Sequence, residues 1–339
     1  MPPIVARKFL TTCCGLAHKC TWCPVVPLRR TYGGRGVSAE WEPTEREIRE
    51  IAGMGIPWIY PDGGDVLLVP WFPKALYLCE ELGLHTGVTL SGQMLRQRLS
   101  DWDIWWLGLP DILRFSAEGG PQVHDTKRAA GCFDAMVEGL EATTKVRKGK
   151  PTLLTLTLVP GPRGNIDKVQ IQYVLDLARR YGAMIVVNFL FGTFQTRRKD
   201  ECGRMWEGLT EQELEVFAWL SEQPEVLPFA DKLAFIRKGG NDIANPSCRA
   251  SEAVLTISPD QYVIRHCFFN THASWKIEED GIRGAMDKLD ELYREKGAEM
   301  SGTIKEYCHG CLALCEMGIG WAHERGLTGV ALAQELMRF

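Results

Sequence analysis

Short β-prone runs alternate with amphipathic helices over about the first 200 residues, and this rhythm limits the chain to few folds. Residues 152–159 and 183–190 are almost continuously apolar, as is typical of strands buried on both faces. The alternation predicts a parallel sheet, either an open doubly wound sheet or a barrel. The predicted strands cover 4–12, 56–60, 86–90, 112–116, 152–159 and 183–190, and the predicted helices cover 44–54, 73–82, 133–147 and 166–181.

Two stretches carry the capping-box pattern, in which a threonine is followed three residues later by a glutamate. They are Thr44-x-x-Glu47 and Thr210-x-x-Glu213. In a capping box the two side chains satisfy backbone N–H groups at the first turn of a helix. The pattern therefore predicts that one helix starts near each threonine.

The β/α rhythm stops after about residue 200. The stretch from Cys248 to Cys267 predicts a β-hairpin, and 280–296 predicts a further helix. We therefore expect a division into two regions, 1–205 and 206–339.

Overall charge and hydropathy argue against two classes of partner. The formal net charge is −4, which does not favour nucleic acid. No apolar run approaches the ~20 residues of a membrane span, and the first residues lack the pattern of a secretory signal peptide. These features predict a cytoplasmic protein with neither nucleic acid nor a membrane as a partner.

The chain has 12 cysteines, and most of them are clustered. One group lies between 13 and 23 and a second between 248 and 315, whereas Cys79, Cys132 and Cys202 are scattered. In a small secreted domain, many cysteines indicate disulfides. In a large chain without an export signal, clusters at ligand spacing indicate a metal site, and scattered cysteines are typically small buried apolar residues.

The first cysteine group leaves three readings open. Cys20 and Cys23 form one knuckle, and the remaining thiol partner lies six residues earlier. Three thiolates cannot close a tetrahedral zinc site without a fourth ligand, but they can hold three irons of a [4Fe–4S] cluster. Spacing alone favours an iron–sulfur cluster over structural zinc and over inert or redox-active thiols.

The stretch "LTTCCGLAHKCTWC" resembles the signature loop of the radical S-adenosylmethionine (radical SAM) superfamily. Three cysteines follow a first strand, and an aromatic residue precedes the last one. The usual spacing is C-x₃-C-x₂-C, whereas this chain has C-x₅-C-x₂-C when the Leu10-Thr11 pair selects Cys14 rather than Cys13. The resemblance implies that Cys14, Cys20 and Cys23 bind a [4Fe–4S] cluster, with Trp22 beside the cofactor.

Two further stretches occur in the order that the superfamily shows. "GGDV" follows strand two, where relatives have Gly-Gly-Glu-Pro, and "SAEG" followed by "HDTKR" comes after strand four. Read alone, His124 is more typical of a satisfied surface or hinge residue than of a catalyst. The resemblance implies that Gly63, Gly64, Asp65 and Ser116 bind SAM, and that the fold is a partial (β/α)₆ TIM-like barrel formed by 1–205.

The second cysteine group resembles the Twitch and SPASM auxiliary-cluster extensions of that superfamily. These have a cysteine, a hairpin with "I-x-P-D-G-x-V", a second cysteine, a helix and a C-x₂-C pair. Here Gln261 replaces the usual glycine, and five cysteines are present instead of the seven of SPASM. Structural zinc stays open as an alternative. The resemblance implies a small C-terminal Twitch domain at 206–339, built from a β-hairpin and helices, with an auxiliary [4Fe–4S] cluster on Cys248, Cys267, Cys308 and Cys311.

Cys315 is then left over from the second group. It is either a core residue or a catalytic residue that gives a hydrogen atom to a substrate radical, as a cysteine does in some epimerases of the superfamily.

The resemblance implies reductive cleavage of SAM to methionine and a 5′-deoxyadenosyl radical that removes a substrate hydrogen. Only about a dozen residues precede the cysteine loop, which favours oxidation or epimerisation of a small hydroxylated metabolite, such as a sugar or aminocyclitol. The alternatives are a peptide-modifying maturase, C–C bond formation on a nucleotide-linked sugar, and a metal-binding scaffold without SAM chemistry. The implied partners are a small-molecule substrate and an electron donor such as flavodoxin or ferredoxin.

Overall fold

The computed structural model describes most of the chain, and the ranges below are the basis for every structural statement. They are 3–14, 35–100, 103–160, 164–189, 209–242, 244, 248–264, 273–308 and 314–338. Within them, the backbone alone is described at 251, 293, 296–308 and 314–317.

The described strands form one sheet in the order β6-β5-β4-β3-β2-β1-β7-β8-β9. Strands β1 to β7 run parallel to one another, and β8 and β9 continue the sheet in antiparallel pairing. The strands are β1 (Val5–Thr11), β2 (Trp58–Gly63), β3 (His85–Leu90), β4 (Ile112–Ala117), β5 (Thr152–Leu158), β6 (Met184–Phe189), β7 (Val254–Ile257), β8 (Tyr262–Ile264) and β9 (Ser274–Lys276).

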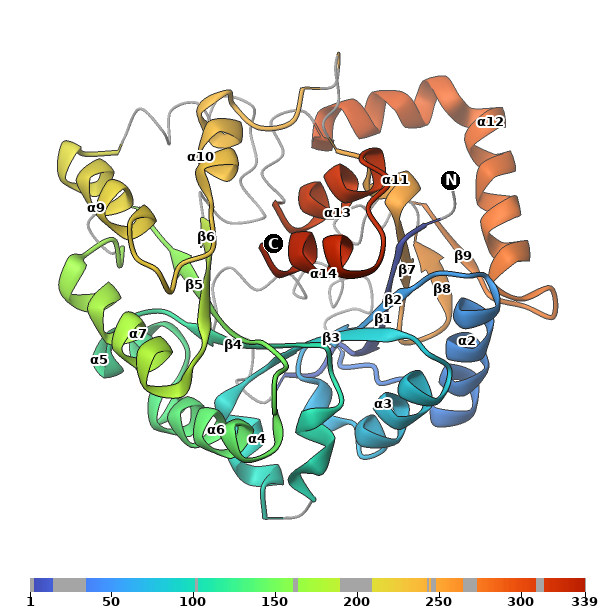
Figure 1. Ribbon diagram of the computed structural model, residues 1–339. Helices are drawn as coiled ribbons and strands as arrows, with labels where there is room; N and C mark the ends of the chain where they lie inside the picture. The colour runs from blue at the N-terminus through green and yellow to red at the C-terminus, as the bar shows by residue number, and fades with distance from the viewer. Residues whose placement is uncertain are drawn as a thin grey trace.

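The helices that connect the parallel strands cover the outer side of the curved sheet (Figure 1). They are α2 (Trp41–Gly53), η1 (Val66–Leu68), α3 (Phe72–Glu81), α4 (Gly92–Arg98), η2 (Ile104–Gly108), α5 (Pro121–Lys127), α6 (Cys132–Val146) and α7 (Lys168–Tyr181). Later in the chain come α9 (Glu211–Ser221), α10 (Ala230–Arg237), α11 (Ala250–Ala253), α12 (Gly281–Cys308), α13 (Leu314–Glu324) and α14 (Gly329–Arg338). None of the described helices is long and apolar enough to span a membrane.

The inner side of the sheet is covered by α13 and α14, which Figure 1 shows inside the curve of the strands. Leu332 and Leu336 of α14 share a buried apolar cluster with strand residues near the amino ends of the parallel strands. These strand residues are Val5, Trp58, Ile112, Leu153 and Val186. The C-terminal helices therefore close one end of the sheet, and the carboxyl ends of the strands stay apart from this cluster.

The first predicted capping box was wrong, whereas the second is confirmed. Helix α2 begins at Trp41, and the Thr44 hydroxyl donates to the Glu40 carbonyl inside the helix. Glu47 instead forms a buried ion pair of 2.6 Å with Lys8 of β1. Lys8, which is distant in sequence, therefore binds the Glu47 side chain that the local pattern assigned to capping. At the start of α9, Thr210 and Glu213 form both hydrogen bonds of a capping box.

The predicted hairpin is confirmed and forms part of the main sheet. Strand β7 pairs in parallel with β1 and antiparallel with β8. Gln261, which stands where the superfamily has glycine, has φ +67°, the left-handed region that favours glycine. No other non-glycine residue of the described chain has a positive φ.

Candidate functional site

The Gly63-Gly64 pair packs against the segment that leads into the first cysteine loop. A Cβ on Gly63 would overlap the Thr11 carbonyl, and one on Gly64 would overlap the Cys13 carbonyl. The Gly64 N–H donates to the Thr11 carbonyl at 2.8 Å, and the Asp65 N–H donates to the Cys13 carbonyl at 2.8 Å. The two motifs are thus held together through backbone contacts that only glycine allows.

Asp65 lies directly after this glycine pair and is almost fully buried. One carboxylate oxygen accepts from the Leu67 N–H at 3.2 Å and caps η1. The other oxygen is buried without a hydrogen-bond partner among the described residues. Burial raises the pKa of Asp65 to about 6.

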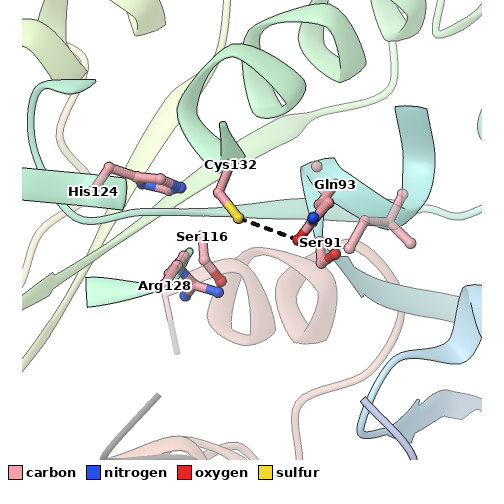
Figure 2. Close-up of a pocket in the computed structure, with 8 residues that line it drawn as sticks. Ser91, Gln93, Ser116, His124, Arg128 and Cys132 are labelled. Carbon is pink, nitrogen blue, oxygen red and sulfur yellow. Dashed lines mark hydrogen bonds between the residues drawn. The ribbon is translucent and has the colours of Figure 1, made fainter. Parts of the chain in front are cut away.

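A small recess opens at the carboxyl ends of β3 and β4 (Figure 2). This is the edge at which sites form in parallel β/α folds. Ser116, one of the predicted site residues, lies in its wall. The lining residues are Leu90, Ser91, Gly92, Gln93, Ser116, His124, Arg128 and Cys132.

Arg128 is oriented by an ion pair with a fully buried glutamate. Its Nη2 lies 2.7 Å and its Nε 3.2 Å from Glu118 Oε1. Burial raises the pKa of Glu118, and the Arg128 charge opposes that rise. Because Arg128 also lines the recess, a guanidinium of fixed orientation faces it, and such a group suits a carboxylate or phosphate.

His124 is buried and accepts a hydrogen bond, so it is satisfied as the sequence suggested, although it does not lie at the surface. Its Nδ1 accepts from the Glu118 N–H at 3.2 Å. Burial lowers the pKa of His124 to about 3. The ring is therefore neutral at pH 7, and its contacts support the backbone after β4.

Asp125 fixes the start of the next helix. Its two carboxylate oxygens accept from the Gly131 N–H at 2.6 Å and from the Phe133 N–H at 2.8 Å. In the "HDTKR" stretch, His124 and Asp125 therefore bind backbone N–H groups before and after it, and Arg128 faces the recess.

Several lining residues were not assigned to the site from sequence, although local signals exist for Ser91 and Arg128. Ser91 caps α4 by accepting from the Met94 N–H at 3.2 Å, and its position directly after a strand is a typical site position. Arg128 belonged to a quoted stretch but received no role. Cys132 is buried, as expected of a scattered cysteine, and its thiol lies 3.5 Å from Gln93 Oε1 in the recess wall.

Most of the predicted cluster ligands lie outside the described residues. Cys14 is half-buried at the end of a described segment, while Cys13 contacts Ser38, with Sγ 4.0 Å from the serine hydroxyl. Cys248 is half-buried, and its N–H donates to Asn241 Oδ1 at 3.0 Å. The backbone alone is described for Cys308 and Cys315, and Cys20, Trp22, Cys23, Cys267 and Cys311 fall outside the described ranges.

No group of three or more histidine, cysteine, aspartate or glutamate side chains within the described ranges is arranged to hold a metal ion. The ligand sets of both proposed clusters therefore stay predictions. Cys79 and Cys132 are buried as expected of scattered cysteines, and burial raises the pKa of the Cys79 thiol to about 12.

Comparison with known proteins shows that solved structures share the fold of this chain. No protein-family model matches the sequence, and no curated protein sequence matches it. The histidine-tagged form of anSMEcpe with bound AdoMet (S-adenosylmethionine) is 13% identical and matches with a TM-score of 0.58 over 99% of each chain.

SuiB from Streptococcus suis shares the fold of this chain over part of its own length. SuiB bound to S-adenosylmethionine is 13% identical, with a TM-score of 0.53 over 77% of this chain and 60% of SuiB. SuiB bound to the precursor peptide SuiA matches with a TM-score of 0.54 and 13% identity, over 79% of this chain and 60% of SuiB. The chain thus has the α/β fold, with a largely parallel sheet, of proteins solved with SAM bound, which is the fold that the resemblance to radical SAM enzymes implies.

Proposed function

We propose that this protein is a radical SAM enzyme with a partial (β/α)₆ barrel. The observation that carries the proposal is the meeting of separate motifs at one edge of the sheet. Gly64 and Asp65 bond to the backbone of Thr11 and Cys13, at the start of the cysteine loop. Ser116 and Arg128 line a recess at the same carboxyl edge of the parallel strands. A metal-binding scaffold would need no such recess.

The described residues are compatible with SAM in charge. Arg128, held by Glu118, suits the methionine carboxylate, and Gly63 and Gly64 lie against the backbone that leads into the proposed cluster loop. Cys14, Cys20 and Cys23 would hold the [4Fe–4S] cluster. The bound cluster and SAM would together supply a 5′-deoxyadenosyl radical that abstracts a hydrogen atom from the substrate.

In this scheme the protein's own residues orient the ligand and support the loop that follows β4. Glu118 keeps Arg128 in one orientation, so the carboxylate of the ligand is bound in one pose. Leu90 contributes an apolar side chain to the lining of the recess, beside Ser116. Neutral His124 holds the loop after β4 without exchanging a proton at pH 7.

In the C-terminal region 206–339 we propose one auxiliary [4Fe–4S] cluster of the Twitch type. Its ligands would be Cys248, Cys267, Cys308 and Cys311, with Cys315 as a candidate hydrogen-atom donor. The β7–β8 hairpin between the first two cysteines supports this assignment. A cytoplasmic electron donor such as flavodoxin or ferredoxin would reduce the clusters.

For the substrate we propose a small hydroxylated metabolite, and a peptide is the second candidate. The peptide candidate is favoured by one observation, since the structurally similar SuiB has been solved with its precursor peptide SuiA.

Metal analysis and EPR test the proposed function. Wild type and the Cys14/Cys20/Cys23→Ala triple variant are reconstituted anaerobically, reduced with dithionite and measured with and without SAM. We expect about eight irons in wild type and about four in the variant, consistent with two [4Fe–4S] clusters and one. SAM should change only the wild-type spectrum, and zinc in both proteins with no effect of SAM would instead indicate a metal-binding scaffold.

A further inference from the structure

The inner face of the sheet carries an arginine directly below the recess. Arg114 and Ser116 lie two residues apart on β4 and share one face, so their Cα atoms are about 7 Å apart. Ser116 lines the recess. We propose that Arg114, with Thr155 of the adjacent strand, binds the carboxylate or phosphate group of a small anionic metabolite. This inference rests on the proposed function and makes that metabolite its substrate.

The charge of Arg114 is not compensated within the described part of the chain. Its one hydrogen bond there runs from Nη2 to the Leu336 carbonyl of α14, at 2.5 Å. Its Nε is buried without an acceptor, and no described carboxylate lies within ion-pair distance. Arg114 as a whole is half-buried, but its Nε is a buried donor that an anion bound on this face would satisfy.

The other charged groups of this face do not supply that anion. Arg7 of β1 is bound by Asp62 of β2 at 2.9 Å, so this carboxylate already has a cation. Asp111, at the start of β4, contacts His85 at 3.3 Å. Burial raises the pKa of Tyr60, which lies beneath Arg7, so its hydroxyl stays neutral.

Thr155 of the adjacent strand adds a second unsatisfied group on this face, two residues beyond Leu153, which is the register partner of Arg114. It pairs in register with Ser116, and its Oγ1 is buried without a hydrogen-bond partner among the described residues. A hydroxyl beside a guanidinium suits carboxylate or phosphate oxygens, because charge-assisted hydrogen bonds to such oxygens are strong. The pair therefore favours an anionic metabolite over a neutral polyol or an aminocyclitol.

A purely structural role for Arg114 makes a different prediction. Leu336 lies in the last turn of α14, where a cation stabilises the free carbonyl groups of a helix. This capping role accounts for the bond from Nη2. It leaves the buried Nε of Arg114 and the buried Thr155 hydroxyl unexplained.

The test is anion binding by the anaerobically reconstituted full chain with SAM present. Inorganic phosphate is followed by ³¹P NMR and acetate by ¹³C NMR, at low ionic strength, in four proteins. These are wild type, Arg114→Gln, Thr155→Val and the control Arg96→Gln, which removes an exposed arginine paired with Glu138. We expect Arg114→Gln to weaken binding at least about tenfold, Thr155→Val a few-fold, and the control not at all. Tighter phosphate or tighter acetate binding identifies which group the substrate carries.

Equal affinity in all four proteins, or no binding by wild type, would overturn the inference. A lower melting temperature of Arg114→Gln with unchanged anion affinity would also overturn it and assign the capping role. Thr155→Val keeps the shape of the side chain. If Arg114→Gln does not fold, the anion affinity of Thr155→Val tests the inference instead. Dithionite-driven SAM cleavage without substrate is measured on the same proteins, so a failure of the proposed function is seen separately from a failure of anion binding.

Discussion

The two ends of the same parallel strands differ in chemistry. At the amino ends, apolar side chains such as Val5 and Ile112 pack against α14, and the end is closed. At the carboxyl ends, close-packed glycines, a buried carboxyl with a free oxygen and an oriented arginine surround a recess. The comparison teaches that stability and ligand binding are separated along the length of the strands, as is usual for parallel β/α folds.

Removing apolar volume at the closed end should have the largest effect. We expect Leu332→Ala, at a position 1% exposed, to lower the free energy of unfolding by about 3 kcal/mol. Chemical denaturation measures the loss, and Val330→Ala on the same helix, at a position 74% exposed, should change it by less than about 0.5 kcal/mol. Similar losses for the two variants would show that α14 does not close this end.

A methyl group at the open end should impair chemistry more than stability. Gly64→Ala would push a Cβ into the Cys13 carbonyl and displace the cysteine loop. We expect SAM cleavage, measured as 5′-deoxyadenosine formed, to fall about 100-fold, because small misplacements in an active site are costly. Gly53→Ala, whose Cβ would meet no atom within 4 Å, is the control. Full activity of Gly64→Ala would contradict the proposed link between the two motifs.

Asp65, at the open end, should make the free energy of unfolding depend on pH. Burial raises the pKa of Asp65 to about 6, so the folded protein binds this proton more tightly than the unfolded chain does. The contribution of Asp65 to the free energy of unfolding therefore rises as the pH falls from about 7 to about 4. We expect wild type to gain about 2 kcal/mol over Asp65→Asn across this range. If the free energies of unfolding of wild type and Asp65→Asn change equally with pH in denaturation experiments, this prediction is wrong.

Removing the Arg128 charge should weaken SAM binding. We expect Arg128→Gln to raise the Kd for SAM about tenfold, measured by calorimetry on the reconstituted protein. Arg179→Gln removes an exposed arginine that pairs with Glu225 and should leave the Kd unchanged. The double variant Glu118→Gln/Arg128→Gln avoids a buried unpaired carboxylate, so its Kd separates lost binding from lost stability. An unchanged Kd in both Arg128 variants would remove Arg128 from the site.

Relief of strain in the β7–β8 turn should have the smallest effect. Gln261 has φ +67°, where a side chain costs about 1 kcal/mol relative to glycine. We expect Gln261→Gly to raise the free energy of unfolding by up to about 1 kcal/mol, measured by chemical denaturation. Because no residue of this turn lines the recess, SAM cleavage should stay at the wild-type rate. A destabilised Gln261→Gly variant would contradict the inference that the turn is strained.

Much of the sheet could be predicted because its strands are continuous apolar runs and its long helices are amphipathic. Helices α4 and α5 were missed because each has only seven residues, too few for a clear period. Helix α13 was missed because its apolar spacing, at Ile319 and Ala322, directly follows Cys311 and Cys315, whose spacing indicated a metal site. The false capping box at Thr44 shows that a local pattern gives way when a partner from another element, here Lys8, binds one of its side chains.

The site could be predicted only where its residues follow strand ends in sequence. Gly63 and Ser116 occur directly at such ends, so order along the chain was sufficient. Cys132 and Gln93 enter the recess because the starts of α6 and α4 converge there, which is a tertiary property without a local signal.

The pairing of β1 with β7 has a consequence for biosynthesis. Val5 pairs with Val254, and Arg114 bonds to a carbonyl 222 residues further along the chain. At a translation rate of about 5–20 residues per second, β1 waits roughly 12–50 s for its second neighbour. During that time a nascent chain exposes an unpaired apolar strand edge, which invites aggregation. We therefore expect yields in heterologous expression to depend on translation speed and on chaperones that bind nascent chains.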